Sequence, residues 1–231
     1  MGKKKIIALI SLVMVMSLVF MLGACGNKND TETTSSESTE ETAGESTGEN
    51  ETSENSSAET GDVQGGIGMH NIEIKIKDYG TVKLELDGDT APITVANFIK
   101  LTNEGFYNGL TFHRIMDGFM VQGGDPQGNG FGGSDETIKG EFASNGVTNN
   151  ISHKKGVISM ARAQDPNSAS SQFFITVADS EFLDGNYAAF GHVTEGQDIL
   201  DKIASDAKPV DNNGTIPKDA QPVIEEILVV E

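Results

Sequence analysis

An alternation of apolar and polar residues predicts two neighbouring strands in the second quarter of the chain. Aliphatic residues occupy every second position from Ile72 to Ile76 and again from Val82 to Leu86. A period of two places these side chains on one face of a strand. Residues 78–80, Asp-Tyr-Gly, supply turn chemistry between the two segments. The pattern therefore predicts an antiparallel hairpin.

A helical spacing follows the hairpin. Thr90 is a suitable N-cap, Pro92 falls in the first turn, and Gly105 ends the pattern. The apolar residues that this helix would bury are Val95, Phe98, Ile99 and Leu101. A second, shorter helical pattern covers residues 196–203.

Runs rich in β-branched and aromatic residues predict further strands along the rest of the chain. They are Leu110–Ile115, Phe119–Gln122, Gly156–Met160, Gln172–Val177, Ala189–Val193 and Val223–Val230. Strands and helices do not alternate regularly, as they would in a parallel α/β sheet. The pattern therefore favours a mainly β fold, a closed eight-stranded antiparallel barrel capped by two helices. Residues 69–231 would form this domain.

The N-terminus carries a different pattern, that of an export signal. Three lysines, residues 3–5, precede an apolar run over residues 6–21, which is shorter than the roughly 20 residues of a membrane-spanning helix. Residues 22–25, Leu-Gly-Ala-Cys, resemble a bacterial lipobox. That resemblance implies a lipoprotein signal peptide over residues 1–24 and lipidation of Cys25. The alternative is an uncleaved membrane anchor.

Residues 25–68 combine the lipidated cysteine with a segment of low hydrophobicity. Glu, Ser, Thr, Asn and Gly dominate this segment, and it contains no aromatic residue. Such a composition cannot bury enough apolar area to fold. We therefore expect a disordered acidic linker, with a specific acidic interaction tail as the alternative.

Charge and cysteine content exclude several classes of protein. The 231 residues include 16 basic and 35 acidic side chains, which gives a net charge of −19. A nucleic-acid partner is not expected, because phosphate recognition requires clustered Lys and Arg. A single cysteine excludes an intramolecular disulfide framework, a multi-cysteine zinc site and an iron–sulfur cluster.

Common catalytic motifs are absent from the sequence. It contains no Gly-x-Ser-x-Gly elbow, no His-Glu-x-x-His pair and no Walker loop. The histidines lack ligand spacing; they are His70, His113, His153 and His192. Residues 128–133 match Gly-x-Gly-x-x-Gly, but no apolar helical face follows them, so we expect a surface loop. Neither a metal nor a cofactor is predicted.

Several separated motifs occur together in the predicted barrel. They are residues 112–125 (FHRIMDGFMVQGGD), 159–163 (SMARA), 171–175 (SQFFI) and 182–185 (FLDG). With these motifs in this order, residues from about 70 to 231 resemble the cyclophilins, the cyclosporin-binding family of peptidyl-prolyl cis-trans isomerases. The Met-Ala-Arg-Ala version is similar to that of bacterial members.

The resemblance implies a set of site residues. Arg114 would be the main catalytic residue, with Gln122 beside it. The residues implied for substrate binding are Phe119, Met120, Ala161, Arg162 through its backbone, Gln172, Phe174, Phe182, Leu183 and Tyr187. The Arg162 side chain would favour acidic residues near the proline. Many members carry Trp and His where this chain has Phe182 and Tyr187, which implies reduced affinity for cyclosporin.

The residues that alternate with the implied site are expected to be core. They are Phe112, Ile115, Val121, Phe173 and Ile175. His113 is expected to have a structural role. No role is indicated for residues 204–222, which are rich in Asp, Asn, Gly and Pro.

These features predict a monomeric prolyl isomerase that is anchored by lipid on Cys25 to the outer face of the cytoplasmic membrane. It would act on proline-containing segments of exported proteins. Two alternatives stay open. One is a non-catalytic peptide-binding or chaperone module on the same fold. The other is a solute-binding lipoprotein of a transporter, against which the lack of two α/β lobes argues.

Overall fold

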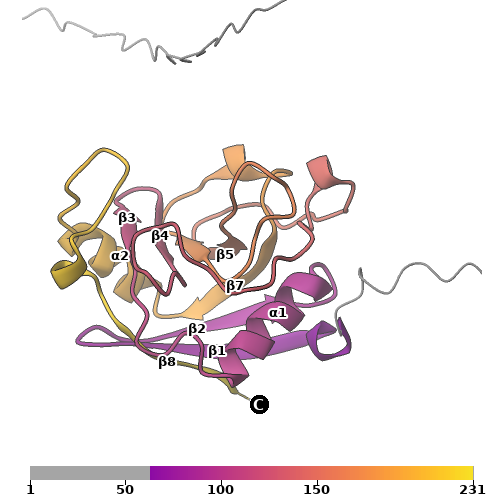
Figure 1. Ribbon diagram of the computed structural model, residues 1–231, viewed down its shortest axis with the longest axis horizontal. Helices are drawn as coiled ribbons and strands as arrows, with labels where there is room; N and C mark the ends of the chain where they lie inside the picture. Colours follow the sequence, from indigo (N-terminus) through magenta and orange to yellow (C-terminus); the bar gives the residue numbers. More distant parts are fainter. Residues whose placement is uncertain (1–62, 231) are drawn as a thin grey trace, which may run out of the picture. The chain divides into compact units, whose positions relative to one another are not determined.

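The computed structural model describes residues 63–230 (Figure 1). The predictions for the signal peptide, Cys25 and most of the linker concern residues 1–62 and lie outside the described residues. Within the described range, no helix has both the length and the apolar character needed to cross a bilayer.

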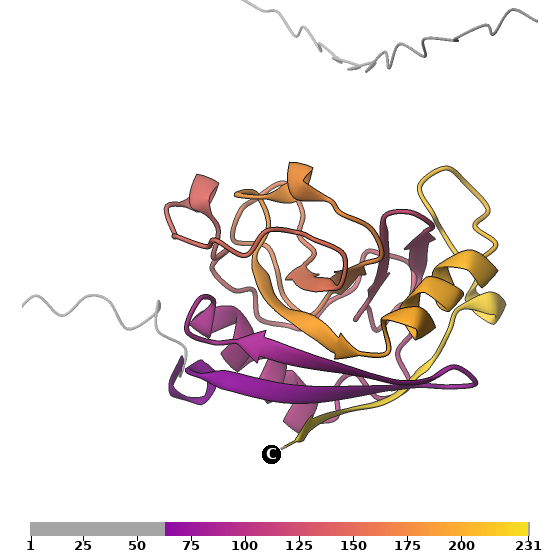
Figure 2. The same cartoon turned by 180° about the vertical axis from the view of Figure 1, so that it is seen from behind.

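The described residues form one antiparallel sheet with the strand order β3-β4-β6-β5-β7-β2-β1-β8. The strands are β1 (Met69–Ile76), β2 (Gly80–Asp87), β3 (Arg114–Met116), β4 (Met120–Gly123), β5 (Val157–Met160), β6 (Phe173–Thr176), β7 (Ala189–Glu195) and β8 (Ile224–Val230). The sheet curls into a half-barrel accompanied by two helices, which confirms the predicted mainly β class. Figure 2 shows the predicted hairpin as two long neighbouring arrows, β1 and β2.

The strands β3 and β8 lie at the two ends of this strand order and are not paired with each other. The segments just before them join instead. Thr111 forms an isolated bridge with Val223, and the N–H of Phe112 donates to the carbonyl of Pro222 at 2.9 Å. The predicted strand from Leu110 to Ile115 is therefore split into this crossing segment and the short β3.

Two helices pack against the sheet. Helix α1 (Pro92–Asn103) contacts β8 and β2, and α2 (Gln197–Asp206) contacts β2 and β4 (Figure 1). Phe98 of α1 is fully buried, with its ring centroid 5.0 Å from Tyr107 and 5.5 Å from Phe173. Burial of such a ring contributes about 1.5–3 kcal/mol. Helix α2 extends three residues beyond its predicted end at Ile203.

The N-terminus of α1 differs from the prediction. Ala91, not Thr90, is the N-cap, and no side chain of the cap itself bonds to the helix. The Thr90 hydroxyl donates to Asp87 at 2.7 Å instead. The buried Glu141 accepts from the backbone N–H groups of Ile93 at 3.1 Å and Thr94 at 2.8 Å. A carboxylate distant in sequence thus satisfies donors that a local cap normally serves.

The described residues include residues 63–68, the last part of the segment assigned to the linker. A 3-10 helix, η1 (Val63–Gly66), contacts α1. A side chain at Gly66 would come within 2.2 Å of the carbonyl oxygen of Pro92, so the close contact requires glycine. Low hydrophobicity therefore did not prevent residues 63–68 from adopting defined structure, because backbone contacts hold them. Three further 3-10 turns are η2 (Ala143–Asn145), η3 (Glu181–Leu183) and η4 (Lys218–Ala220).

Candidate active site

The register of three neighbouring strands brings predicted site residues into one line. Arg114 on β3 lies opposite Gln122 on β4, and Gln122 lies opposite Phe174 on β6. Side chains alternate between the two faces of a strand. The residues between these positions face the other way and are buried, as predicted; with their neighbours they are Phe112, Ile115, Val121, Phe173 and Ile175.

An apolar slot lies on the face that carries Arg114. Its base is a small cluster of buried side chains, Met120, Phe174 and Leu183. The partly buried residues packed against this cluster are Met116, Phe119, Ala161 and Tyr187. The slot encloses a cavity of about 310 Å³ and is not filled by the protein's own side chains. Nearly all predicted site residues line it: Arg114, Phe119, Met120, Gln122, Ala161, Arg162, Phe174, Phe182, Leu183 and Tyr187.

The Arg114 guanidinium is held at the edge of this slot. Its Nε donates to the carbonyl oxygen of Asn213 at 2.7 Å, and its Nη1 donates to Oε1 of Gln122 at 2.9 Å. Its Nη2 lies 3.2 Å from the sulfur of Met116. Burial lowers the pKa of Arg114, but a guanidinium starts so high that it stays charged. The positive charge is therefore fixed in place beside apolar surface.

Gln172 is the one predicted site residue that does not line the slot, and it supports Gln122 instead. The Gln122 amide donates to Oε1 of Gln172 at 2.9 Å. The Gln172 amide in turn donates to the carbonyl oxygens of Gly132 at 2.7 Å and Gly130 at 3.1 Å. This chain of amides leads from Arg114 to residues 128–133, which we call the glycine-rich loop. It also fixes which atom of the Gln122 amide faces the guanidinium.

The glycine-rich loop is a surface loop, as predicted, and the buried side chain of Asp125 binds its backbone. Asp125 is 1% exposed, and its carboxylate accepts from the backbone N–H groups of Gln127 at 2.7 Å, Asn129 at 2.9 Å and Gly130 at 2.6 Å. Burial by itself raises the pKa of Asp125, but these hydrogen bonds outweigh it and leave the pKa below its usual value. The loop is thus shaped by a buried charge.

A buried polar chain supports Phe174 from behind. The His153 ring stacks on Phe174 with centroids 6.1 Å apart. Its Nδ1 lies 2.8 Å from a carboxylate oxygen of Asp184, and its Nε2 lies 3.0 Å from the hydroxyl of Ser159. Burial lowers the pKa of His153. Although the order Asp-His-Ser resembles a hydrolase triad, Ser159 is fully buried and lines neither the slot nor another cavity described here, so the chain supports the wall of the slot.

The side chain of Arg162 binds neighbouring loops. Its Nε and Nη2 donate to the carbonyl oxygen of Asn186 at 3.0 and 2.8 Å, and its Nη1 donates to that of Ala163 at 2.9 Å. The guanidinium carbon lies 4.9 Å from the ring centroid of Tyr187 and 5.0 Å from that of Phe142. These acceptors are neutral backbone carbonyl groups, so the positive charge of Arg162 remains, and the expected preference for acidic substrates stays a prediction.

Phe182 forms an exposed rim of the slot. It is 72% exposed and lies 5.5 Å from the ring of Phe119. Two contacts with Arg114 were not predicted, those from Met116 and from the backbone of Asn213. Met116 could have been found, because it lies two residues after Arg114 on the same face of a strand. The contribution of Asn213 has no sequence signal, because any residue has a carbonyl group.

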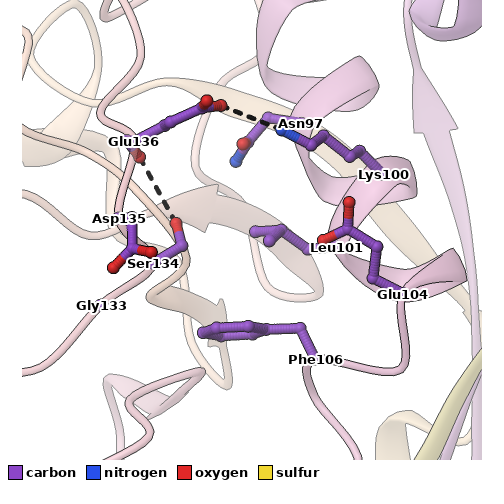
Figure 3. Close-up of a pocket in the computed structure, with 9 residues that line it drawn as sticks. All are labelled: Asn97, Lys100, Leu101, Glu104, Phe106, Gly133, Ser134, Asp135 and Glu136. Carbon is purple, nitrogen blue, oxygen red and sulfur yellow. Dashed lines mark hydrogen bonds and ion pairs between the residues drawn. The ribbon is translucent and has the colours of Figure 1, made fainter.

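A separate hollow of about 240 Å³ lies between α1 and residues 133–136. Figure 3 shows Lys100 and Glu136 reaching toward each other across it, with a separation of 2.9 Å. None of the predicted site residues lines this hollow.

The described residues also contain no group of three or more His, Cys, Asp or Glu side chains placed to hold a metal ion. The chemistry available at the slot is thus a fixed cation and an amide beside apolar surface.

Comparisons with known proteins agree with this geometry. The profile of the family described as "Cyclophilin type peptidyl-prolyl cis-trans isomerase/CLD" matches residues 71–229. Peptidyl-prolyl cis-trans isomerase A of Dickeya dadantii is 46% identical over 132 residues, which cover 54% of this chain and 66% of that protein. Peptidyl-prolyl cis-trans isomerase B of Bacillus subtilis is 44% identical over 130 residues, 56% of this chain and 87% of that protein.

A solved structure shows the same fold. The cyclophilin-type isomerase of Cryptosporidium parvum aligns with a TM-score of 0.63 and 29% identity. The alignment covers 71% of this chain and 99% of that one. A second structure of that protein, in the presence of the dipeptide Ala-Pro, aligns with a TM-score of 0.61 and 30% identity over 70% of this chain and 99% of that one.

Proposed function

The chain belongs to the cyclophilin family and is a peptidyl-prolyl cis-trans isomerase, and we propose that it catalyses X-Pro rotation in exported proteins at the outer face of the cytoplasmic membrane. The single observation that carries the catalytic part is the open apolar slot with the Arg114 guanidinium fixed at its edge. The placement at the membrane is supported by the sequence of residues 1–25 alone.

The reaction requires no bond to break. Rotation about a peptide bond has a barrier of about 18–20 kcal/mol, because the nitrogen lone pair is delocalised into the carbonyl group. For X-Pro both isomers are populated. In the twisted transition state the lone pair returns to the prolyl nitrogen, which then accepts hydrogen bonds. A donor fixed beside that nitrogen stabilises the twisted form more than either planar form.

Arg114 is the donor that we assign to this step. Its contacts with Asn213 and Gln122 hold the guanidinium before substrate arrives, so little reorganisation is needed. An acceleration of about 10⁵ corresponds to about 7 kcal/mol of transition-state stabilisation. A charge-assisted hydrogen bond beside apolar surface, together with apolar binding that selects the twisted conformer, supplies energies of this size.

The other site residues would bind the peptide. Three buried side chains, Met120, Phe174 and Leu183, would contact the proline ring. Phe119, Ala161, Phe182 and Tyr187 would form the rim. The Gln122 side chain and the Arg162 backbone would hold the adjoining peptide group, and Gln172 would keep Gln122 oriented. We also propose that cyclosporin binds in this slot with reduced affinity, because Phe182 and Tyr187 supply neither an indole nor an imidazole N–H.

Replacement of Arg114 tests the catalytic proposal. We expect Arg114→Ala to lower kcat/KM for a short Ala-Pro peptide by about 10²–10³, the usual loss when one transition-state donor is removed. Arg114→Lys keeps the charge but loses the planar fork, so it should recover only part of the loss. The assay is protease-free cis-to-trans relaxation, measured with the full chain.

Two results would contradict this assignment. Unchanged kcat/KM in Arg114→Ala would remove the guanidinium from the mechanism. If the wild type isomerises no X-Pro peptide but still prevents aggregation of an unfolded protein, and Arg114→Ala does the same, the non-catalytic chaperone alternative holds.

A further inference from the structure

A second cavity, of about 290 Å³, adjoins the proline slot. The two cavities share Arg114 and Gln122 as a common wall. The other lining residues of the second cavity are His113, Asn129, Gly130, Phe131, Asn213 and Thr215. We call this space the His113 cavity. It is large enough to hold one side chain of a peptide whose proline occupies the slot.

His113 lacks the hydrogen bonds expected of a structural histidine. The residue is 3% exposed, and neither ring nitrogen has a hydrogen-bond partner. Buried polar groups without a partner are rare and call for an explanation, because each loses its hydrogen bonds to water and gains none in the protein. The predicted structural role therefore does not account for its place beside the slot.

The ring faces an open position on the glycine-rich loop. A Cβ added to Gly130 would come within 3.7 Å of Nε2 of His113. Because glycine has no side chain, this space beside the imidazole stays free. Gly130 also has a φ of +90°, which favours glycine there. At Gly130 the loop thus places no side chain against the imidazole.

The walls of the His113 cavity are fixed before a ligand arrives. Asp125 holds the loop at residues 129 and 130 through two backbone hydrogen bonds. On the opposite wall Asp211 accepts from the backbone N–H groups of Asn213 and Thr215, both at 3.0 Å. A preformed cavity with an unpaired polar group is typical of a specificity site.

The charges around the cavity select an uncharged ligand. Burial lowers the pKa of His113, and Asp125 opposes this while Arg114 adds to it. A neutral imidazole offers one donor and one acceptor. Arg114 disfavours Lys and Arg side chains, whereas Asp125 and Asp211 on the two walls disfavour carboxylates. A hydroxyl or a carboxamide, which both donates and accepts, matches the imidazole.

We propose that the His113 cavity is a specificity subsite for a Ser, Thr, Asn or Gln side chain of the substrate, hydrogen-bonded to the His113 ring. The residue would lie one or two positions from the proline, because adjoining cavities share a wall and each residue spans about 3.3–3.6 Å. This subsite rests on the proposed function of the slot. It would make the enzyme select among X-Pro sequences.

Matched peptides test the subsite. Each pair carries Thr or Val, or Asn or Leu, at one position within two residues of the proline. We expect the polar member to have a kcat/KM about 3- to 10-fold higher at one position, the effect of one net hydrogen bond. His113→Phe should reduce this ratio to one, and His113→Gln should retain it. His192→Gln, an exposed histidine on β7, is the matched control and should leave the ratio unchanged.

A titration of the full-length wild type with the same peptides gives a readout that survives if His113→Phe fails to fold. The ¹⁵N resonances of the His113 ring should shift with the Thr peptide and not with the Val peptide. Equal affinities and an unshifted ring at every position would overturn the subsite and leave water as the occupant. If the wild type does not accelerate isomerisation of the Ala-Pro reference peptide, the proposed function is overturned instead. The ratio of the Kd values for the polar and apolar members of each peptide pair would still decide whether the subsite exists.

Discussion

At the residue scale, Arg162 shows how one side chain can join the segments that form a binding wall. Its guanidinium lies between the rings of Tyr187 and Phe142 and donates to the carbonyl oxygen of Asn186. It therefore joins the loop that carries Tyr187 to the segment that carries Ala161. We regard the Arg162 side chain as a positioning residue.

Replacement of this side chain should affect binding more than turnover. We expect Arg162→Ala to raise KM about fivefold with little change in kcat, because a partly exposed cation–π contact contributes about 0.5–1 kcal/mol. The KM of Arg162→Lys should lie between those of the wild type and Arg162→Ala, since lysine keeps the charge and loses the planar stack. The measurement is peptide relaxation at several substrate concentrations.

The same variants separate positioning from charge recognition. If Arg162 only positions the wall, the ratio of kcat/KM for Glu-Pro and Lys-Pro peptides at low salt stays the same in the wild type and in Arg162→Ala. A Glu-Pro preference that disappears in the variant would show instead that the guanidinium reads substrate charge.

At the element scale, the glycine-rich loop depends on one buried carboxylate. Asp125 holds three backbone N–H groups of the loop, and the loop carbonyls orient Gln172. The loop has no strand or helix of its own. Its shape therefore relies on the charged form of Asp125.

Acid should weaken this loop, and Asp125→Asn should imitate the effect. A folded-state pKa below the unfolded value means that the charge stabilises the fold above about pH 4, and that this contribution is lost as the pH falls further toward the folded pKa. We expect Asp125→Asn to lower the free energy of unfolding by about 2 kcal/mol at pH 7, since charge-assisted hydrogen bonds are lost.

Chemical denaturation between pH 3 and pH 7 measures the effect. The difference in unfolding free energy between wild type and Asp125→Asn should be largest near neutral pH and shrink below about pH 4. Asp135→Asn, an exposed residue of the same segment, serves as the control. A difference that does not change with pH would mean that the charge of Asp125 does not stabilise the loop.

Elements with a local pattern could be predicted, and those made by distant partners could not. The alternation at β1 and β2 gave the hairpin correctly, because each strand's apolar face belongs to one sheet. The start of α1 was wrong because Glu141, distant in sequence, caps it in place of Thr90. Residues 110–115 were predicted as one strand, but their partners change from the segment before β8 to β4.

At the scale of the whole molecule, the proposed location separates the anchor from the catalytic unit. Every residue that we assign to the slot or the His113 cavity lies between positions 113 and 215. The lipid would be carried by Cys25, and two or more acyl chains suffice for stable anchoring. The anchor should therefore decide where the enzyme acts and not how fast.

Replacement of Cys25 tests this separation. We expect Cys25→Ser to move the protein from the membrane fraction to the soluble fraction, with kcat/KM for the Ala-Pro peptide changed less than about twofold. Fractionation and metabolic labelling with a fatty acid are the measurements. A wild type that takes up no label, together with a variant that stays in the membrane, would favour the uncleaved apolar anchor.

The sequence by itself determined the mainly β class, the hairpin, the core positions and the family, because alternation and motif order are local properties of the chain. The same motifs indicated the residues of the slot through the resemblance to the cyclophilins, because the site residues of that family fall at matching positions of this sequence. Only the tertiary structure decided how they are held. The carbonyl of Asn213 on Arg114, the carbonyls on Arg162 and the unpaired ring of His113 come from segments whose proximity the folded chain alone creates, and backbone groups carry no sequence signal.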